Sequence, residues 1–448
     1  MKSKKRFLLA VFFILIIVIA YNYPKLNIIS GYASKNMASS VFVAERSAGS
    51  IEENDNNVPL IKLADVEMRE NTASATVFGL MERRTICRDG LGCVLINNNY
   101  DPKKNILRPN RNTVDSLAYY PFENRVTDNV FFDNVDYDLL EKAVDGAFAN
   151  AEVQKTRTVL VAYKNKLLTE RYADGFTPET PILGWSMTKS VLATLYGILE
   201  YQGRLNMNYR PFKELALVDS TGTDPREIIT LDDLLRMSSG LAWNEDYTQI
   251  SDVTKMLFLD EDMTQAQQET DFNPKDHGKV WNYSSGTSNL LSGILRKQFK
   301  NHQEYLDFPY SALIDKIGMY SMLVETDMAG NFVGSSYGWA STRDWAKFGL
   351  LYLNKGNWNG ERLFDSQWVD YVTRPTPLSN GTYGAHFWLN ANGKYPDVPK
   401  DLYSANGYQG QYVFIVPSKD LVVVRTGLAE SPDFDVNGFL KEVLAAID

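Results

Sequence analysis

Segments with the pattern of β-strands lie at both ends of the main part of the chain, and helical segments lie between them. The segment TVLVAYKNKLLTERYA (158–173) has the pattern of a hairpin with its turn at 164–166. More strands are predicted toward the other end, in GAHFWLN (384–390), QYVFIVP (411–417) and DLVVVRTG (420–427). This order predicts an α/β sandwich that is interrupted by a helical lobe.

The N-terminus carries a basic tip followed by a long apolar run. Four cationic side chains come first: Lys2, Lys4, Lys5 and Arg6. The run FLLAVFFILIIVIAY (7–21) that follows is either a membrane anchor or the core of a signal peptide. Because basic residues stay on the cytoplasmic side, we expect residues 1–24 to be a signal-anchor or signal peptide. The body would then be exported, periplasmic or extracellular, held at the membrane by the anchor or secreted after cleavage.

The next part, residues 25–135, is expected to be an N-terminal extension. Residues 25–65 are mixed and polar, which suggests a stalk or an irregular wrap. Residues 72–98 alternate between apolar and polar side chains, which predicts a short antiparallel meander. Residues 99–135 are rich in Asn, Asp and Pro and suit a long surface loop. The main domain is expected over 136–448, beginning with a helix in YDLLEKAVDGAFAN (137–150).

Composition excludes several classes of function. The formal net charge is -9, and no stripe of Lys and Arg interleaved with aromatics occurs, so nucleic acid is not an expected partner. Cys87 and Cys93 are the two cysteines, and with three histidines they exclude a Cys-rich or His-rich zinc site. The two cysteines flank a turn that contains Gly90 and Gly92, and they either form a disulfide or stay as two separate thiols.

Ser186 and Lys189 form the first candidate site. They open the apolar helix SMTKSVLATLYGILEYQG (186–203), and their spacing places both side chains on one face. The helix N-terminus supplies positive potential and free N–H groups, so the amide of Ser186 can serve as an oxyanion donor. Burial lowers the pKa of a lysine and lets it act as a base. The alternative is a capping serine with a solvated lysine, which the apolar helix disfavours.

Two later segments carry further candidates. Tyr283 stands in WNYSSG (281–286) ahead of another helix, with Ser285 as a cap or hydrogen-bonding neighbour. Tyr283 can shuttle a proton if a nearby cation depresses its pKa, and the alternative is that it simply packs on the helical lobe. In SANGYQGQ (404–411), two glycines beside a core strand allow a close approach of backbone to ligand. An amide on this edge can be a second oxyanion donor, and the alternative is a plain hairpin turn.

The order of the three segments resembles the serine β-lactamase and penicillin-binding superfamily, with S-x-x-K, then Y-S-S, then a glycine-rich strand edge. ITLDDLLRMSSGL (229–241) is similar to its LL-x-H-T-S-G stretch, with Met237 in place of His. GWASTRDWAKFGLLYLNKG (338–356) resembles its Ser-x-x-Asp-Met-Ala-x-Phe-Gly helix. The resemblance covers about residues 145–448 and implies a β-lactamase-like fold, an antiparallel sheet flanked by helices with a mostly helical lobe inserted.

Within that superfamily the chain looks most similar to class C-like hydrolases of the 6-aminohexanoate-dimer hydrolase and esterase type. The resemblance implies Ser186 as nucleophile, Lys189 as its base partner and Tyr283 as proton shuttle. It implies an oxyanion hole formed by the backbone N–H groups of Ser186 and Tyr408. The residues expected to face the substrate are Tyr247, Ser285, Asn406 and Gly407, and for Tyr247 the alternative is loop packing. The expected substrate is a small-molecule ester or amide, and neither a metal nor an organic cofactor is implied.

Two departures from the family pattern limit the substrate. Ala405-Asn406-Gly407 stands where K-T-G is usual, so the cation that holds a β-lactam carboxylate is missing. Ser285 stands where β-lactamases usually have Asn. One alternative function is a penicillin-binding DD-peptidase or β-lactamase, which this missing cation disfavours. The other is a catalytically silent, membrane-anchored sensor that keeps S-x-x-K and stalls at the acyl stage.

Overall fold

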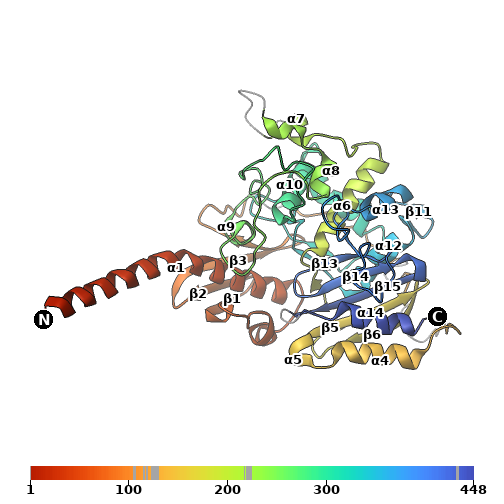
Figure 1. Cartoon of the computed structure of the whole chain (residues 1–448), viewed down its shortest axis with the longest axis horizontal. Helices are drawn as coiled ribbons and strands as arrows, with labels where there is room; N and C mark the ends of the chain where they lie inside the picture. Colours follow the sequence, from red (N-terminus) through yellow and green to blue (C-terminus); the bar gives the residue numbers. More distant parts are fainter. Residues whose placement is uncertain are drawn as a thin grey trace.

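The centre of the molecule is a six-stranded antiparallel sheet with the strand order β12-β13-β14-β15-β5-β6 (Figure 1). The computed structural model describes residues 2–103, 107–114, 117, 120–122, 131–215, 217, 224–429 and 433–447. The strands of this sheet are β5 (Thr156–Tyr163), β6 (Lys166–Tyr172), β12 (Trp388–Leu389), β13 (Tyr403–Gly407), β14 (Gln411–Val416) and β15 (Leu421–Gly427). Strands β15 and β5 pair side by side, so the two ends of the main region meet in one sheet as predicted.

Helices cover both faces of this sheet. On one face lie α4 (Tyr137–Phe148) and α14 (Val436–Ala445), and on the other lie α6 (Met187–Tyr201) and α12 (Thr342–Leu353) (Figure 1). Along β5 the buried side chains alternate between the two cores, with Val161 in one and Leu160 in the other. Residues 159–163 of β5 are buried and apolar without interruption, as expected of a strand covered on both faces, and this run made the strand recognisable in the sequence.

The chain between β6 and β12 supplies the predicted helical lobe. Its helices are α7 (Pro211–Glu214), α8 (Leu231–Leu235), α9 (Asp252–Leu259), α10 (Ser285–Arg296), α11 (His302–Pro309) and α13 (Ser366–Thr373). Short strands lie in the same stretch: β7 (Ile182–Leu183), β8 (Leu323–Val324), β9 (Gly338–Ala340), β10 (Asn357–Trp358) and β11 (Glu361–Arg362). In the β7-β9-β8 sheet, β9 ends just before Ser341, whose side chain caps α12 by accepting from the amide of Asp344. The expected antiparallel sheet, flanked by helices and with a mostly helical lobe inserted, is present.

A second antiparallel sheet is formed by the N-terminal region. It contains β1 (Ala64–Arg69), β2 (Thr72–Val77), β3 (Leu80–Arg88) and β4 (Gly92–Ile96) in sequential order. The strands predicted within 72–98 are present, and β1 was not anticipated. Cys87 and Cys93 lie directly opposite each other in β3 and β4 and form a disulfide, which sequence alone had left open. The surface loop expected over 99–135 falls partly outside the described residues.

The interpretation of residues 25–65 as a stalk or irregular wrap is wrong for most of its first half. Helix α1 (Lys2–Phe42) continues through it, and its second half packs across β2, β3 and β4 (Figure 1). Small side chains on this half are buried against the sheet, including Ala33, Ser34 and Ala38. Such residues look like linker composition in the sequence, but they let a helix approach a sheet closely.

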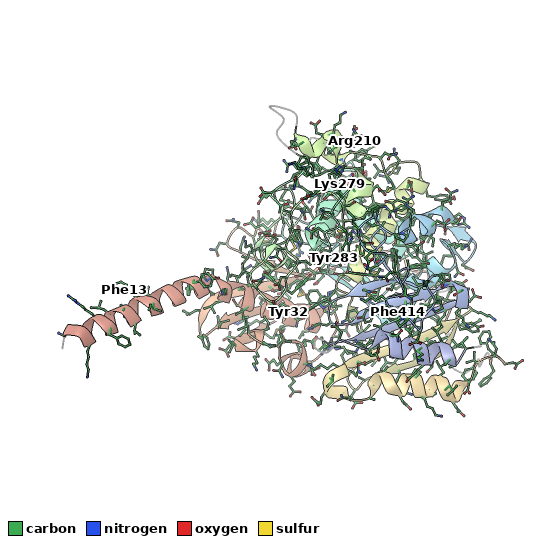
Figure 2. The ribbon with its side chains drawn as sticks, viewed as in Figure 1. Phe13, Tyr32, Arg210, Lys279, Tyr283 and Phe414 are labelled. Atoms are coloured by element: carbon green, nitrogen blue, oxygen red, sulfur yellow. A yellow bond between two sulfur atoms is a disulfide. The ribbon has the colours of Figure 1, made fainter. Side chains whose placement is uncertain are left out.

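The start of α1 extends away from the body, with Phe13 on the outer part and Tyr32 where the helix reaches the body (Figure 2). Several side chains in the predicted anchor, those of Leu8, Leu15, residues 17–20 and Asn22, lie outside the described set. Among the described residues, no helix combines the length and the apolar character needed to cross a bilayer. The anchor stays a prediction.

Two buried ion pairs join the N-terminal region to the rest of the molecule, one between Lys35 and Glu325 and one between Asp55 and Arg157 of β5. Lys35 in α1 donates to Glu325, at 2.6 Å. The Glu325 carboxylate, which is fully buried, also accepts from Ser39, the Cys93 amide and the Trp339 indole. Burial lowers the pKa of Lys35, and the charge of Glu325 opposes that shift. The N-terminal region is therefore held against the body by charges that water does not screen.

We expect Glu325→Ala to destabilise the fold by roughly 3–5 kcal/mol, because it leaves the buried ammonium of Lys35 without its counter-ion. The matched control is Glu361→Ala, which removes an exposed carboxylate 2.8 Å from Lys316 and should cost at most about 1 kcal/mol. Urea denaturation of the full chain measures both variants. Equal losses in the two variants would show that the N-terminal contact does not stabilise the fold.

Candidate active site

Ser186 stands at the N-terminal end of α6, directly after a tight turn. Trp185 has a positive φ of 47°, and a Cβ on Gly184 would lie 2.3 Å from the ring of Trp345. The turn therefore requires glycine at 184 and is packed against the core. The Ser186 side chain makes no capping bond to the helix, which leaves its hydroxyl available to neighbouring side chains.

Lys189 is buried beside this serine. Its Nζ lies 3.0 Å from Ser186 Oγ, 2.9 Å from Ser285 Oγ and 2.9 Å from the carbonyl oxygen of Ser335. The residue is 1% exposed, which excludes the solvated lysine considered from sequence. Burial lowers the pKa of Lys189 to about 8, and the charge of Glu245 opposes the shift. An amine in this state is present in its neutral, proton-accepting form in an appreciable fraction at neutral pH.

Tyr283 lies where the helical lobe meets the central sheet, just ahead of α10 (Figure 2). Its ring centroid is 5.0 Å from Lys189 Nζ. Burial raises the pKa of Tyr283, the charge of Glu245 raises it further, and a hydrogen bond with the Ser186 side chain partly offsets both. The expectation that a nearby cation depresses the pKa of Tyr283 is therefore wrong, because burial outweighs the nearby Lys189. The phenol keeps its proton at neutral pH, so it suits the donation of a proton better than its removal.

The edge of β13 runs beside the turn that presents Ser186. A Cβ on Gly407 would lie 2.1 Å from the carbonyl oxygen of Gly184, so only glycine permits this approach. Tyr408 follows at the strand end, with its ring 5.7 Å from that of Trp185. Asn406 is opposite Tyr412 in the register, and strand alternation places it on the other face from Ala405, which packs in the core with α6.

Aromatic side chains line both sides of the serine. Tyr247 stacks on Tyr408, with the ring centroids 5.1 Å apart, and its ring is 6.4 Å from that of Trp185. This contact places Tyr247 next to the residue that precedes the nucleophile candidate. On the other side, the ring of Tyr283 lies 5.4 Å from that of Trp388 and 5.8 Å from that of Tyr383. The site is therefore walled largely by aromatic rings.

Sequence reasoning missed two contributors to this site. Glu245 accepts a hydrogen bond from the amide of Ser285 at 2.8 Å and another from Ser285 Oγ. Ser335 contributes only its carbonyl oxygen, which carries no side-chain signal in the sequence. Glu245 sits two positions before Tyr247 in a loop without periodicity, so its spacing from Ser186 could not reveal the contact. In the described part of the chain, no cluster of three or more His, Cys, Asp or Glu side chains could hold a metal ion.

Comparison with known proteins gives a consistent result. The family model Beta-lactamase matches residues 148–436. A 6-aminohexanoate-dimer hydrolase of Paenarthrobacter ureafaciens is 23% identical over 327 residues, which cover 65% of this chain and 79% of the relative.

Solved structures agree in fold. A Bacillus anthracis protein provisionally assigned as a 6-aminohexanoate-dimer hydrolase has a TM-score of 0.57 at 19% identity, over 78% of this chain and 89% of its own. A family VIII carboxylesterase has a TM-score of 0.55 at 15% identity, over 69% of this chain and 96% of its own. At these identities the structural likeness supports the fold alone.

Gly407→Ala should slow covalent labelling of Ser186 by a fluorophosphonate about 100-fold, because the new methyl group displaces the strand edge from the serine turn by about an ångström. The control is Gly49→Ala, where an added Cβ meets nothing within 4 Å. Labelling is followed by intact-mass spectrometry, and circular dichroism checks that both variants fold. If Gly407→Ala folds and is labelled at the normal rate, the edge of β13 is not part of the active site.

Proposed function

The chain belongs to the β-lactamase family of serine hydrolases, and from this premise we propose that it cleaves an ester or amide bond in a small molecule through an acyl-enzyme on Ser186. The observation that carries the proposal is the 3.0 Å contact between Lys189 Nζ and Ser186 Oγ in a buried setting. A serine hydroxyl becomes a useful nucleophile only when an adjacent base removes its proton.

Acylation begins with the neutral form of Lys189. Its lone pair takes the Ser186 hydroxyl proton while the serine oxygen bonds to the substrate carbonyl carbon, and the carbonyl electron pair moves onto oxygen. Backbone N–H groups of Ser186 and Tyr408 are the proposed donors to this oxyanion. The step leaves Lys189 as an ammonium and a tetrahedral intermediate on Ser186.

The intermediate then collapses. The bond between the carbonyl carbon and the leaving oxygen or nitrogen breaks, and Tyr283 donates its phenolic proton to the leaving group. The Lys189 ammonium, 5.0 Å from the centre of the Tyr283 ring, then returns a proton to the phenolate through an intervening water. This relay needs a tyrosine that stays protonated, in agreement with the raised pKa of Tyr283. For deacylation, neutral Lys189 takes a proton from water, the hydroxide adds to the acyl carbon, and Ser186 leaves with the proton returned to it.

The character of the site supports linear acyl groups over β-lactams. Ala405 occupies the position where the family usually carries a cation, and it is fully buried. The walls formed by Trp185, Tyr247 and Trp388 offer apolar contact to a linear chain. The names of the relatives, a 6-aminohexanoate-dimer hydrolase and a carboxylesterase, fit the same substrate range. We therefore favour a linear amide or ester over peptidoglycan stems or penicillins.

The rate of Ser186 acylation should rise with pH and level off above a midpoint near the Lys189 pKa of about 8, because only the neutral amine accepts the serine proton. The measurement is kcat/KM for a p-nitrophenyl ester between about pH 6 and about pH 10, with the labelled residue mapped by mass spectrometry. Lys189→Ala should lose about 1,000-fold or more, and Ser186→Ala should lose all turnover.

The same assay tests the alternatives. Full activity in Ser186→Ala, or a label on another serine, would contradict the proposal. An acyl-enzyme that forms but is not released would favour the silent sensor. Covalent labelling by a fluorescent penicillin at a rate comparable to that of the ester would favour the penicillin-binding function.

A further inference from the structure

The carboxylate of Glu245 is held by hydrogen bonds from Trp243, Tyr247 and Ser285. Oε2 accepts from the Trp243 indole at 2.5 Å and from the Ser285 amide at 2.8 Å. Oε1 accepts from Ser285 Oγ and, over 3.4 Å, from the Tyr247 hydroxyl. A carboxylate has no proton to give, so each of these contacts fixes the direction of its donor.

The contact with Ser285 determines how that hydroxyl faces Lys189. A serine hydroxyl has one proton, and here it points to Glu245. Ser285 Oγ can therefore only accept from Lys189 Nζ, 2.9 Å away. The carbonyl oxygen of Ser335, also at 2.9 Å, can only accept as well. Two N–H bonds of Lys189 are thereby assigned to fixed acceptors in either protonation state.

The remaining direction of the lysine nitrogen is the one toward Ser186 Oγ, at 3.0 Å. A neutral amine has two N–H bonds and one lone pair, so the lone pair must occupy this direction. We propose that Glu245 is a positioning residue, which acts through the Ser285 hydroxyl to aim the lone pair of Lys189 at Ser186. The inference rests on the proposed acylation chemistry and adds to it the group that orients the base.

The charge of Glu245 has a second effect at the same place. It raises the pKa of Lys189 against the larger effect of burial. Once Lys189 has taken the serine proton, the Glu245 carboxylate is separated from the new ammonium only by the Ser285 hydroxyl. Its negative charge then stabilises the ammonium until the leaving group departs. The other titratable groups that face this pair are Tyr247, Tyr283 and Tyr383, whose pKa values are raised, and His386, whose pKa burial lowers to about 3. Lys189 is thus the group in this set that titrates between neutral and mildly alkaline pH.

Replacing Glu245 with Gln tests the orientation directly. The amide of Gln can donate to Ser285 Oγ, which frees the serine proton to turn toward Lys189 and occupy its lone pair. We expect Glu245→Gln to lower kcat/KM on a p-nitrophenyl ester about 100-fold at the alkaline plateau, with KM changed less than kcat. The ascending limb of the pH profile should also move to lower pH, because removal of the negative charge lowers the pKa of Lys189.

Three comparisons separate positioning from general damage. Glu245→Asp keeps the acceptor-only group and should recover part of the rate. Ser285→Ala removes the intermediary, so Glu245→Gln added to it should cost little more. Glu152→Gln, at an exposed position in α5 (Ala151–Gln154), removes the same charge and should change neither the rate nor the pH midpoint. Thermal melting confirms that each variant is folded.

An NMR titration of the ¹³Cε signal of Lys189 provides a readout that does not depend on turnover. A shift of its midpoint to lower pH in Glu245→Gln, together with the fall in plateau rate, supports the inference. An unchanged plateau, or a fall in rate with an unmoved pH limb and NMR midpoint, overturns it. If the NMR midpoint moves between the wild-type protein and Glu245→Gln, but the wild-type protein shows neither esterase activity nor a label on Ser186, the proposed function itself has failed, and with it the catalytic meaning of this contact.

Discussion

Lys189 carries an amine that can take up a proton although its side chain is almost fully buried. Burying such a group is costly unless its hydrogen-bonding directions are filled, and here three acceptors surround it. They come from three separate segments: the start of α6, the start of α10 and the loop at 335. The fold must bring these three segments within hydrogen-bonding distance before any chemistry can occur. The packing of α6, α10 and the loop at 335 against one another is therefore a requirement for the lysine to act as a base.

The inserted helical lobe provides two of the three acceptors. Helix α10 supplies Ser285, and its Asn289 accepts from the amide of Ser335 and so fixes the loop that supplies the carbonyl. On the sheet side, the amide of Gly338 donates to Thr188, one position before the lysine, at 2.9 Å. A small displacement of the lobe would separate the lysine from Ser285 and from the carbonyl oxygen of Ser335 together, while Ser186, on the same helix, would stay beside it. This explains why the base lies in the interface between lobe and sheet.

Sequence alone predicted those parts of the fold and site that depend on local patterns. Such patterns depend on residues that are close together in the sequence. Examples are the spacing of Ser186 and Lys189 on an apolar helix, the strand pattern of β5 and β15, and the Tyr283 segment ahead of α10. Glu245 was missed because its contact with Ser285 spans 40 positions and belongs to a loop without periodicity. The second half of α1 was predicted as a stalk or wrap and is a helix. Its small Ala and Ser residues have the composition of a linker, and the sequence does not show the sheet against which they pack.

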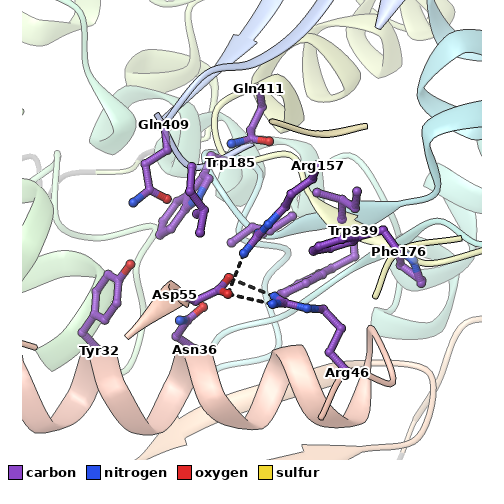
Figure 3. A pocket seen from close by; sticks show the side chains of 14 residues that line it. Tyr32, Asn36, Arg46, Asp55, Arg157, Phe176, Trp185, Trp339, Gln409 and Gln411 are labelled. Carbon is purple, nitrogen blue, oxygen red and sulfur yellow. Dashed lines mark hydrogen bonds and ion pairs between the residues drawn. The ribbon is translucent and has the colours of Figure 1, made fainter. Parts of the chain in front are cut away.

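The N-terminal region is best understood as a support for the serine turn. Its Asp55 lies between Arg46 and Arg157 beneath Trp185 (Figure 3), and Arg157 belongs to β5 of the central sheet. The second tie, from Lys35 to Glu325, also engages Trp339 in β9, the strand that pairs with β7 just before Gly184. Buried ion pairs add little net stability compared with an apolar contact, but they tolerate few alternative arrangements. These two ion pairs therefore favour a single position of the N-terminal region against the body. Because they engage β5 and β9, which lie next to the turn before Ser186, they also restrict the position of Ser186.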